Sequence, residues 1–237
     1  MENGKKIILL ADDFVGLEIT KFLIKNYKKD IAAVFCTKKN DIYNLVKASK
    51  LNYKIFKDEK ILKKQLEKIE FDIGILAWWP NILSNKIISL ANTGFINTHN
   101  SYLPNNRGKH PYFWAIIEEV DYGVTIHWVN EGIDTGDIIV QKKIEYTWED
   151  NSETIYLKSL KELIKLFSIS YPSIRNKNIK STPQHKNGSF HYSSELDKFS
   201  QIDLERNYKA RDLLNIIRAR TTSSDKFKSA FFKDGND

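Results

Sequence analysis

Short apolar runs alternate with amphipathic patterns along the first hundred residues, and this alternation limits the folds open to the chain more than any other feature. Runs of this kind are typical of strands that are covered on both faces, and the patterns between them have the period of helices. Such an order predicts an α/β fold with a mostly parallel, twisted sheet and helices on both of its faces. The expected strands are Ile7–Ala11, Ile31–Cys36, Tyr53–Phe56, Ile73–Ala77 and Gly94–Thr98, with helices at Gly16–Asn26, Asp41–Ser49, Glu59–Ile69 and Asn85–Ala91.

The order changes in the second half of the chain. Two further apolar strands, Val124–Val129 and Ile138–Ile144, are separated by a loop that contains Asp134. A long helix is expected from Ser152 to Tyr171 and should stop before Pro172, because the residue before a proline disfavours the helical conformation. The remainder is polar and rich in loops up to a helix at Lys209–Ala219. We therefore predict a catalytic domain of residues 1–177 and a small C-terminal subdomain of residues 178–237.

Charge and cysteine content narrow the class of protein. The 237 residues carry a formal net charge of +7, but the lysines are scattered over predicted helix faces and loops, which favours a solvated surface over a nucleic-acid partner. A smaller anion such as a nucleotide diphosphate is compatible with the same charge. The single Cys36 forms neither an internal disulfide nor a metal cage. No run approaches the ~18 apolar residues of a membrane span, so we expect a cytoplasmic protein with no membrane partner.

Asn97 and His99 are the first candidates for chemistry. They lie at the carboxyl end of the predicted strand Gly94–Thr98, where an open parallel sheet binds its ligands. Being two residues apart on an extended segment, their side chains should point to the same side. A lone histidine is more often a surface or core residue, but this position beside Asn97 favours a functional one. An amide can stabilise an oxyanion, and an imidazole can carry a proton.

Asp134 is the third candidate, in the loop Gly132–Asp137. Two aspartates and two glycines there are also typical of an ordinary hairpin turn. The functional interpretation is that the glycines let the backbone approach a ligand while one aspartate points inward. Together with Asn97 and His99, the carboxylate completes a set of groups suited to moving an acyl group onto an amine.

Other chemistries are disfavoured. The turn Ala11–Gly16 has no Gly-x-Gly-x-x-Gly pattern for a dinucleotide, and no Gly-x-Ser-x-Gly elbow surrounds Ser101. The remaining histidines show no metal-ligand spacing, so we expect no catalytic metal. Trp78 and Trp79 follow the strand Ile73–Ala77. Adjacent tryptophans commonly pack in a core, but neighbours on an extended segment point in opposite directions, so one of them could line a pocket for a flat ligand.

Several motifs in the same order resemble the 10-formyltetrahydrofolate-dependent formyltransferases, which include the methionyl-tRNA and glycinamide ribonucleotide enzymes. The resemblance implies a Rossmann-like formyltransferase fold. Within that family, three segments look most like the branch that formylates nucleotide-linked amino sugars. At 237 residues, we expect the chain to lack the added C-terminal barrel that a resemblance to the tRNA enzyme would require. The family motifs are Phe95–Pro104, Asn106–Gly108, Gly123–His127 and Gly132–Ile138, and the branch segments are Asn106–Trp114, Gly188–Tyr192 and Ala210–Thr221.

The resemblance also implies site residues. Asn97, His99 and Asp134 correspond to the catalytic trio of the family. The walls that hold the folate correspond to Trp79, Pro80, Ile82, Leu83, Asn130, Glu131, Gly132 and Ile133. For the nucleotide sugar the candidates, on charge and aromatic character, are Arg107, Lys109, His191, Tyr192, Arg211 and Arg218, each of which could equally be a surface charge or a packing side chain.

The resemblance implies a homodimer and 10-formyltetrahydrofolate as the formyl donor. It favours dTDP-4-amino-4,6-dideoxyglucose as the acceptor, for the synthesis of O-antigen or another surface polysaccharide. The alternatives are a dTDP-3-amino sugar, methionyl-tRNA, a purine precursor or an amino acid as acceptor, or a catalytically silent module that binds a folate or a nucleotide sugar.

Overall fold

The computed structural model describes residues 5–176, 180–185, 187–223 and 229–233 of the chain. These described residues form two compact units. Those of unit 1 lie within the ranges 1–99, 126–140 and 163–184, and those of unit 2 within the ranges 100–125, 141–162 and 185–237. The predicted boundary between residues 177 and 178 lies outside the described residues.

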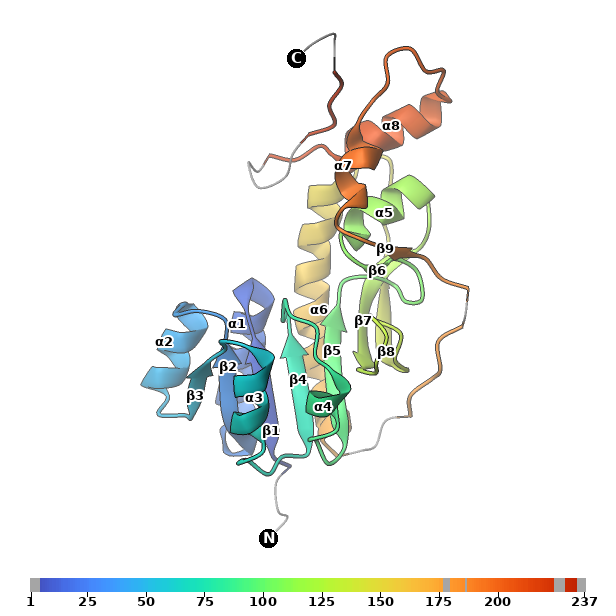
Figure 1. Cartoon of the computed structure of the whole chain (residues 1–237). Coiled ribbons are helices and arrows are strands. Elements are labelled where there is room, and N and C mark those ends of the chain that lie inside the picture. Colours follow the sequence, from blue (N-terminus) through green and yellow to red (C-terminus); the bar gives the residue numbers. More distant parts are fainter. Residues whose placement is uncertain (1–4, 177–179, 186, 224–228, 234–237) are drawn as a thin grey trace. The chain divides into compact units, whose positions relative to one another are not determined.

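A seven-stranded sheet has the strand order β3-β2-β1-β4-β5-β7-β8 (Figure 1). Its strands are β1 (Ile7–Ala11), β2 (Ile31–Cys36), β3 (Tyr53–Ile55), β4 (Ile73–Ala77), β5 (Gly94–His99), β7 (Tyr122–Trp128) and β8 (Ile138–Ile144). The first five strands pair in parallel. Strand β7 runs antiparallel to β5, since Val129 N–H donates to the Phe95 carbonyl and His127 lies beside Asn97. The predicted α/β class with a mostly parallel sheet is confirmed.

The core of unit 1 follows from the apolar runs. Every residue of β1 and of β4 is buried, and a cluster around Phe35, Phe71 and Phe95 fills the space between the sheet and the helices. Gly74 is needed there, because a Cβ atom would lie 2.1 Å from the Phe95 ring. Helices α1 (Asp13–Tyr27), α2 (Asp41–Ala48), α3 (Glu59–Leu66) and α4 (Asn85–Ile88) lie where helices were predicted, and a 3-10 turn, η1, spans Lys28–Asp30.

The predicted end of the long helix is wrong. Helix α6 spans Ser152–Arg175 and continues through Pro172. Tyr171 and Ile174 are buried beside the proline, and Arg175 donates two hydrogen bonds to the buried carboxylate of Asp30, at 2.5 and 3.1 Å. This packing and the ion pair offset the hydrogen bond that a proline inside a helix removes.

Unit 2 contains short elements that the sequence did not predict. Strand β6 (Arg107–Gly108) pairs in parallel with β9 (Phe190–His191), and helices α5 (Pro111–Glu118) and α7 (Glu195–Ser200) flank them in the chain. Gly108 has a φ of 87° and lies so close to the His191 carbonyl oxygen that a Cβ atom would be 2.4 Å from it. Only glycine fits this position.

Helix α8 (Ala210–Ala219), close to its predicted bounds, packs on α5 with its polar face inward. Asn215 is 3% exposed and donates to Glu119, whereas Leu214 and Ile217 are 54% and 44% exposed. Because residues three apart share a helix face, this side of α8 presents an apolar stripe to solvent.

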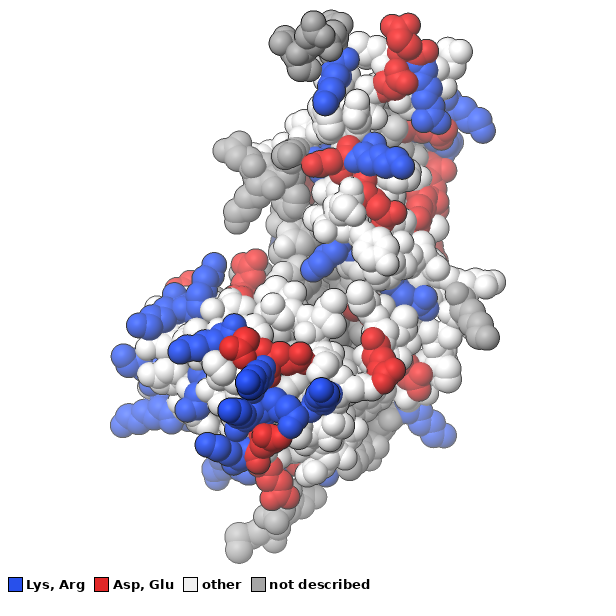
Figure 2. Space-filling view, viewed as in Figure 1, with Lys and Arg blue, Asp and Glu red and all other residues white. Residues whose placement is uncertain are grey.

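Charged side chains are mixed on the visible surface. Figure 2 shows lysines and arginines interspersed with aspartates and glutamates on the face that it draws. Within the described ranges, no helix combines the length and the apolar character that a bilayer crossing requires.

Candidate active site

Strand β5 and the loop between β7 and β8 bring the predicted trio together within unit 1. Asn97 Nδ2 donates to Asp134 Oδ1 at 3.2 Å, and His99 Nδ1 lies 3.6 Å from Asp134 Oδ2. The imidazole of His99 is buried, and Asp134 is half-buried. Asn97 and His99 therefore project to the same side of β5, as their spacing predicted. Their part in catalysis stays a prediction.

The loop that carries Asp134 is held by hydrogen bonds from its own side chains and from Gln184. Asn130 Oδ1 accepts from Gly132 N–H at 3.1 Å and from the Thr135 hydroxyl at 2.7 Å. Gln184 Nε2 donates to the carbonyls of Asp134 and Gly136, at 2.9 and 2.7 Å. Asp134 itself has a φ of 53°, a left-handed conformation that surrounding contacts must maintain.

The two glycines of the loop have a role that the sequence interpretation missed. A Cβ atom at Gly136 would lie 1.8 Å from the Trp128 carbonyl oxygen, and one at Gly132 would lie 2.1 Å from Thr135 Oγ1. Gly136 therefore needs glycine so that the loop can fold against the backbone of β7, whereas a side chain at Gly132 would require the Thr135 side chain to shift.

His127 is a site residue that sequence reasoning missed. Its side chain, on β7, is 2% exposed, and its Nε2 lies 3.3 Å from Asn97 Nδ2 and 3.4 Å from Asp134 Oδ1. The ring is perpendicular to that of His99, with the ring centroids 6.3 Å apart. The sequence signal for it is a histidine inside an apolar strand directly before the Asp134 loop.

The residues predicted to hold the folate all belong to unit 1, and they differ in exposure. Trp79 is buried in the core cluster and packs edge-on against Phe56, with ring centroids 5.2 Å apart. Trp79 is therefore a core residue, as adjacent tryptophans commonly are. Leu83 is also buried, while Ile82 is 73% exposed. The others, Pro80, Asn130, Glu131, Gly132 and Ile133, are exposed.

The residues predicted to bind the nucleotide sugar all belong to unit 2, where they form two groups. Around the β6–β9 ladder, Lys109 N–H donates to the His191 carbonyl at 3.0 Å, and Arg107 and Tyr192 lie on or next to the same strands. His191 is buried, stacks on Trp114 with ring centroids 3.7 Å apart, and lies 2.8 Å from the Glu118 carboxylate.

Arg211 and Arg218 form the second group, on α8. Their guanidinium groups lie 5.1 and 4.3 Å from the ring of Trp148. Arg211 also pairs with Glu119 at 3.0 Å, and Arg218 donates to the Thr147 carbonyl at 2.9 Å. Burial lowers the pKa of Arg218. No described contact joins these arginines to the β6–β9 group.

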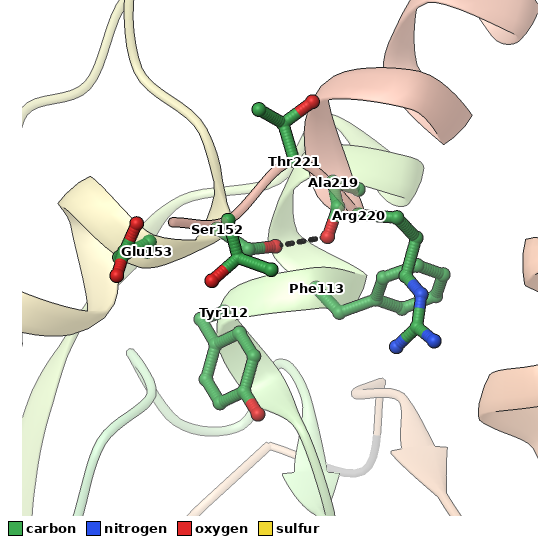
Figure 3. Close-up of a pocket in the computed structure, with 8 residues that line it drawn as sticks. Tyr112, Phe113, Ser152, Glu153, Ala219, Arg220 and Thr221 are labelled. Carbon is green, nitrogen blue, oxygen red and sulfur yellow. Dashed lines mark hydrogen bonds between the residues drawn. The ribbon is translucent and has the colours of Figure 1, made fainter. Parts of the chain in front are cut away.

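Unit 2 also contains a small pocket, whose lining includes no residue of either group. Tyr112 and Phe113 of α5, the start of α6 and the end of α8 enclose it (Figure 3). The Ser152 hydroxyl and the Ala219 carbonyl are hydrogen-bonded across it. Burial raises the pKa of Tyr112 and lowers that of Arg220, so the pocket is a poorly solvated place for charge.

The sheet order and the groups on β5 define the class. An open α/β sheet that gathers an amide, two imidazoles and a carboxylate beside its last parallel strand is a Rossmann-like fold equipped for group transfer.

The chain belongs to the formyl transferase family, whose family model matches residues 17–168. A second model, described as the N-formyltransferase dimerization C-terminal domain, matches residues 195–237. The predicted family, its fold and the class of transferase enzymes are thereby confirmed.

Curated relatives carry the name methionyl-tRNA formyltransferase. That of Thermodesulfovibrio yellowstonii is 34% identical over 163 residues, which are 68% of this chain and 52% of the relative. That of Malacoplasma penetrans is 27% identical over 92% of this chain and 71% of the relative. The chain thus spans about half the length of the first relative and about 71% of the second.

Solved structures match nearly the whole chain. A 4-N formyltransferase from Francisella tularensis is 25% identical, with a TM-score of 0.81 over 98% of this chain and 93% of the other. A sugar N-formyltransferase from a Shewanella species is 20% identical, with a TM-score of 0.80 over 98% of this chain and 94% of the other. At that identity the second match shows the fold alone.

Proposed function

We propose that this protein transfers a formyl group from 10-formyltetrahydrofolate to the amino group of a nucleotide-linked amino sugar. The observation that carries the proposal is the convergence of Asn97, His99 and Asp134 in a chain of the formyl transferase family. The match to a 4-N formyltransferase over 98% of the chain supports a sugar acceptor.

The chemistry would begin with the acceptor amine as its free base. Its nitrogen attacks the formyl carbon, and the carbonyl electron pair moves to oxygen to give a tetrahedral intermediate. Asn97 would donate a hydrogen bond to that oxyanion, an interaction worth about 3 kcal/mol when well placed. His99 would accept the proton of the amine or donate to the oxyanion, with Asp134 orienting its ring. When the intermediate collapses, the carbonyl re-forms, the bond between the formyl carbon and N10 of the folate breaks, and N10 takes up the proton that left the amine. Tetrahydrofolate is released, and the formyl group stays on the amine.

Binding both substrates in reach of one another would supply a large part of the rate, about 7 to 11 kcal/mol. The exposed loop residues Pro80, Ile82, Glu131 and Ile133 are the proposed folate contacts. Arg107, Lys109 and Tyr192 are the proposed contacts of the nucleotide sugar. His191, Arg211 and Arg218 are weaker candidates, since protein acceptors and the rings of Trp114 and Trp148 already engage them.

The preferred acceptor is dTDP-4-amino-4,6-dideoxyglucose, since a relative at 25% identity is a 4-N formyltransferase. A Helicobacter canadensis N-formyltransferase of the same fold was solved with folinic acid and dTDP-3-aminofucose, which supports a folate-type donor and a dTDP-linked acceptor. The product would serve the synthesis of O-antigen or another surface polysaccharide in the cytoplasm.

A second candidate is methionyl-tRNA, because the relative at 34% identity has that name. The two acceptors are separated by one assay. Purified protein and 10-formyltetrahydrofolate are mixed with dTDP-4-amino-4,6-dideoxyglucose, a dTDP-3-amino sugar, methionyl-tRNA or glycinamide ribonucleotide, and release of tetrahydrofolate is followed. Turnover with the first acceptor alone supports the proposal. Preferred turnover of methionyl-tRNA would overturn it, as would ligand binding without turnover of any acceptor.

The proposal includes a homodimer made through the C-terminal segment. The match to a dimerization domain over residues 195–237 supports it. So does the exposed apolar stripe of α8, which contains Leu214 and Ile217, because an apolar helix face is seldom left in water.

A further inference from the structure

His127 contacts two members of the predicted trio, although the proposed chemistry assigns it no task. Its side chain is 2% exposed, and its Nε2 lies 3.3 Å from Asn97 Nδ2. A histidine this deeply buried is expected to have each ring nitrogen matched to a partner. Those partners determine where its proton lies.

Three contacts of the ring bear on the position of its proton. Nδ1 lies 2.7 Å from the carbonyl oxygen of Trp128, and a carbonyl can only accept, so Nδ1 carries hydrogen. Nε2 lies 3.3 Å from the amide nitrogen of Asn97, which can only donate, and 3.4 Å from Asp134 Oδ1, which accepts from that same amide. A second proton on Nε2 would donate to Asp134 but would set two donors against each other across the 3.3 Å to Asn97. The amide donor therefore favours a neutral imidazole with its hydrogen on Nδ1.

The amide of Asn97 has two hydrogens, and both have an acceptor. One points to His127 Nε2, and the other to Asp134 Oδ1 at 3.2 Å. A flipped amide would place its oxygen against the lone pair of His127 and the carboxylate of Asp134, which are both repulsive contacts. The pair of acceptors thus fixes which edge of the amide faces Asp134.

We propose that His127 is a positioning residue for the transfer, which holds the N–H edge of Asn97 on the side of β5 where Asp134 and His99 lie. An oxyanion formed beside that edge can then share or take over one of the two amide hydrogens, which point to His127 Nε2 and Asp134 Oδ1, with no rotation of the amide during the reaction. The effect on turnover rests on the proposed function, but the tautomer of His127 does not.

The tautomer is measured first, by long-range proton–nitrogen correlation of the five histidine side chains in the full-length protein. The His127 signals are assigned by their absence in His127→Gln, or by backbone-linked experiments if that variant does not fold. We expect a protonated Nδ1 and an unprotonated Nε2. An Nε2–H tautomer or an imidazolium at neutral pH would overturn the inference.

Two variants then test the positioning role. The side-chain oxygen of a glutamine can reach the place of Nε2, whereas an asparagine reaches only the place of Nδ1. We expect His127→Asn to lower kcat about tenfold, as for the loss of one hydrogen bond, with KM within about twofold of the wild type. His127→Gln should recover most of that loss.

Equal losses in the two variants, or an unchanged kcat in His127→Asn, would contradict the positioning role. Melting temperatures of both variants exclude a simple loss of folding. If the wild-type protein turns over no acceptor, the proposed function fails, while the tautomer measurement still decides the inference about His127.

Discussion

Asp134 Oδ2 lies 3.6 Å from His99 Nδ1, and the other oxygen of the same carboxylate accepts from Asn97. One carboxylate thus contacts both Asn97 and His99 of β5. Asp134→Asn keeps the size of the side chain but removes its charge. We expect kcat to fall by about 10²-fold or more, the range found when an acid–base pair is disabled.

The matched control for that variant is Asp137→Asn in the same loop. The backbone carbonyl of Asp137 accepts from Trp128 N–H, and the substitution keeps this contact. Steady-state release of tetrahydrofolate should distinguish the two variants, and circular dichroism should show both folded. Comparable turnover in the two would rule out a special role for Asp134.

The loop geometry makes Gly136→Ala a disruptive change. The added methyl group would lie 1.8 Å from the Trp128 carbonyl oxygen, so the loop must shift and take Asp134 with it. We expect a loss of unfolding free energy of about 1 to 3 kcal/mol, together with a lower kcat. Urea unfolding and turnover are the measurements. Thr135→Ser, which keeps the hydroxyl that Asn130 accepts, should be close to wild type.

Asp30 is a buried carboxylate that depends on Arg175. Asp30 is 4% exposed, and Arg175→Met would leave its charge without the guanidinium. We expect the variant to lose about 3 kcal/mol of unfolding free energy, since a stranded buried charge costs more than the pair contributes. Asp30→Asn combined with Arg175→Met should be more stable than Arg175→Met alone. A double variant that is less stable than the single one would contradict this account.

His110 gives unit 2 a dependence on pH. Burial, aided by the nearby Lys109 and Arg220 charges, lowers the pKa of His110 below its usual 6.5. As the pH falls, the unfolded chain therefore takes up a proton on His110 before the folded chain does. The neutral His110 contributes its full free energy of folding above pH 6.5, and this contribution is lost as the pH falls toward the lower pKa of His110 in the folded protein. Thermal melts between about pH 5 and pH 8 should show this decline, and His110→Gln should reduce it. An unchanged profile in the variant would assign the decline to other groups.

The apolar stripe of α8 tests the proposed dimer. Leu214→Glu combined with Ile217→Glu places two charges on a face that is exposed in the single chain. Light scattering should show the wild type as a dimer and the variant as a folded monomer. Lys209→Glu, next to the same helix, is the control for added negative charge. A wild type that is monomeric at every concentration would contradict the proposal.

The sheet could be predicted because its strands are nearly pure apolar runs. Ile7–Ala11, Ile31–Cys36, Ile73–Ala77 and Ile138–Ile144 begin and end where the sequence placed them. The continuation of α6 past Pro172 could not be predicted, because it depends on tertiary packing and on a long-range ion pair between Arg175 and Asp30. The ladder of β6 and β9 was missed for a related reason, since two-residue strands have no period to detect.

The candidate site could also be predicted only in part. Strand geometry and the family motifs predicted that Asn97, His99 and Asp134 lie close together, and the structure shows these contacts. The contact of His127 with Asn97 depends on the antiparallel register of β7, which no local pattern encodes. The burial of Trp79 against Phe56 likewise depends on tertiary packing.

The central claim is formyl transfer to a nucleotide-linked amino sugar, and mass spectrometry of the acceptor tests it most directly. Wild-type protein is incubated with 10-formyltetrahydrofolate and dTDP-4-amino-4,6-dideoxyglucose, beside Asn97→Ala and His99→Ala. We expect a sugar nucleotide that gains one formyl group with the wild type, and a far slower gain with either variant. Two results would contradict the proposed function. One is a wild type that formylates methionyl-tRNA but leaves the sugar nucleotide unmodified, and the other is an equal gain of formyl groups with all three proteins.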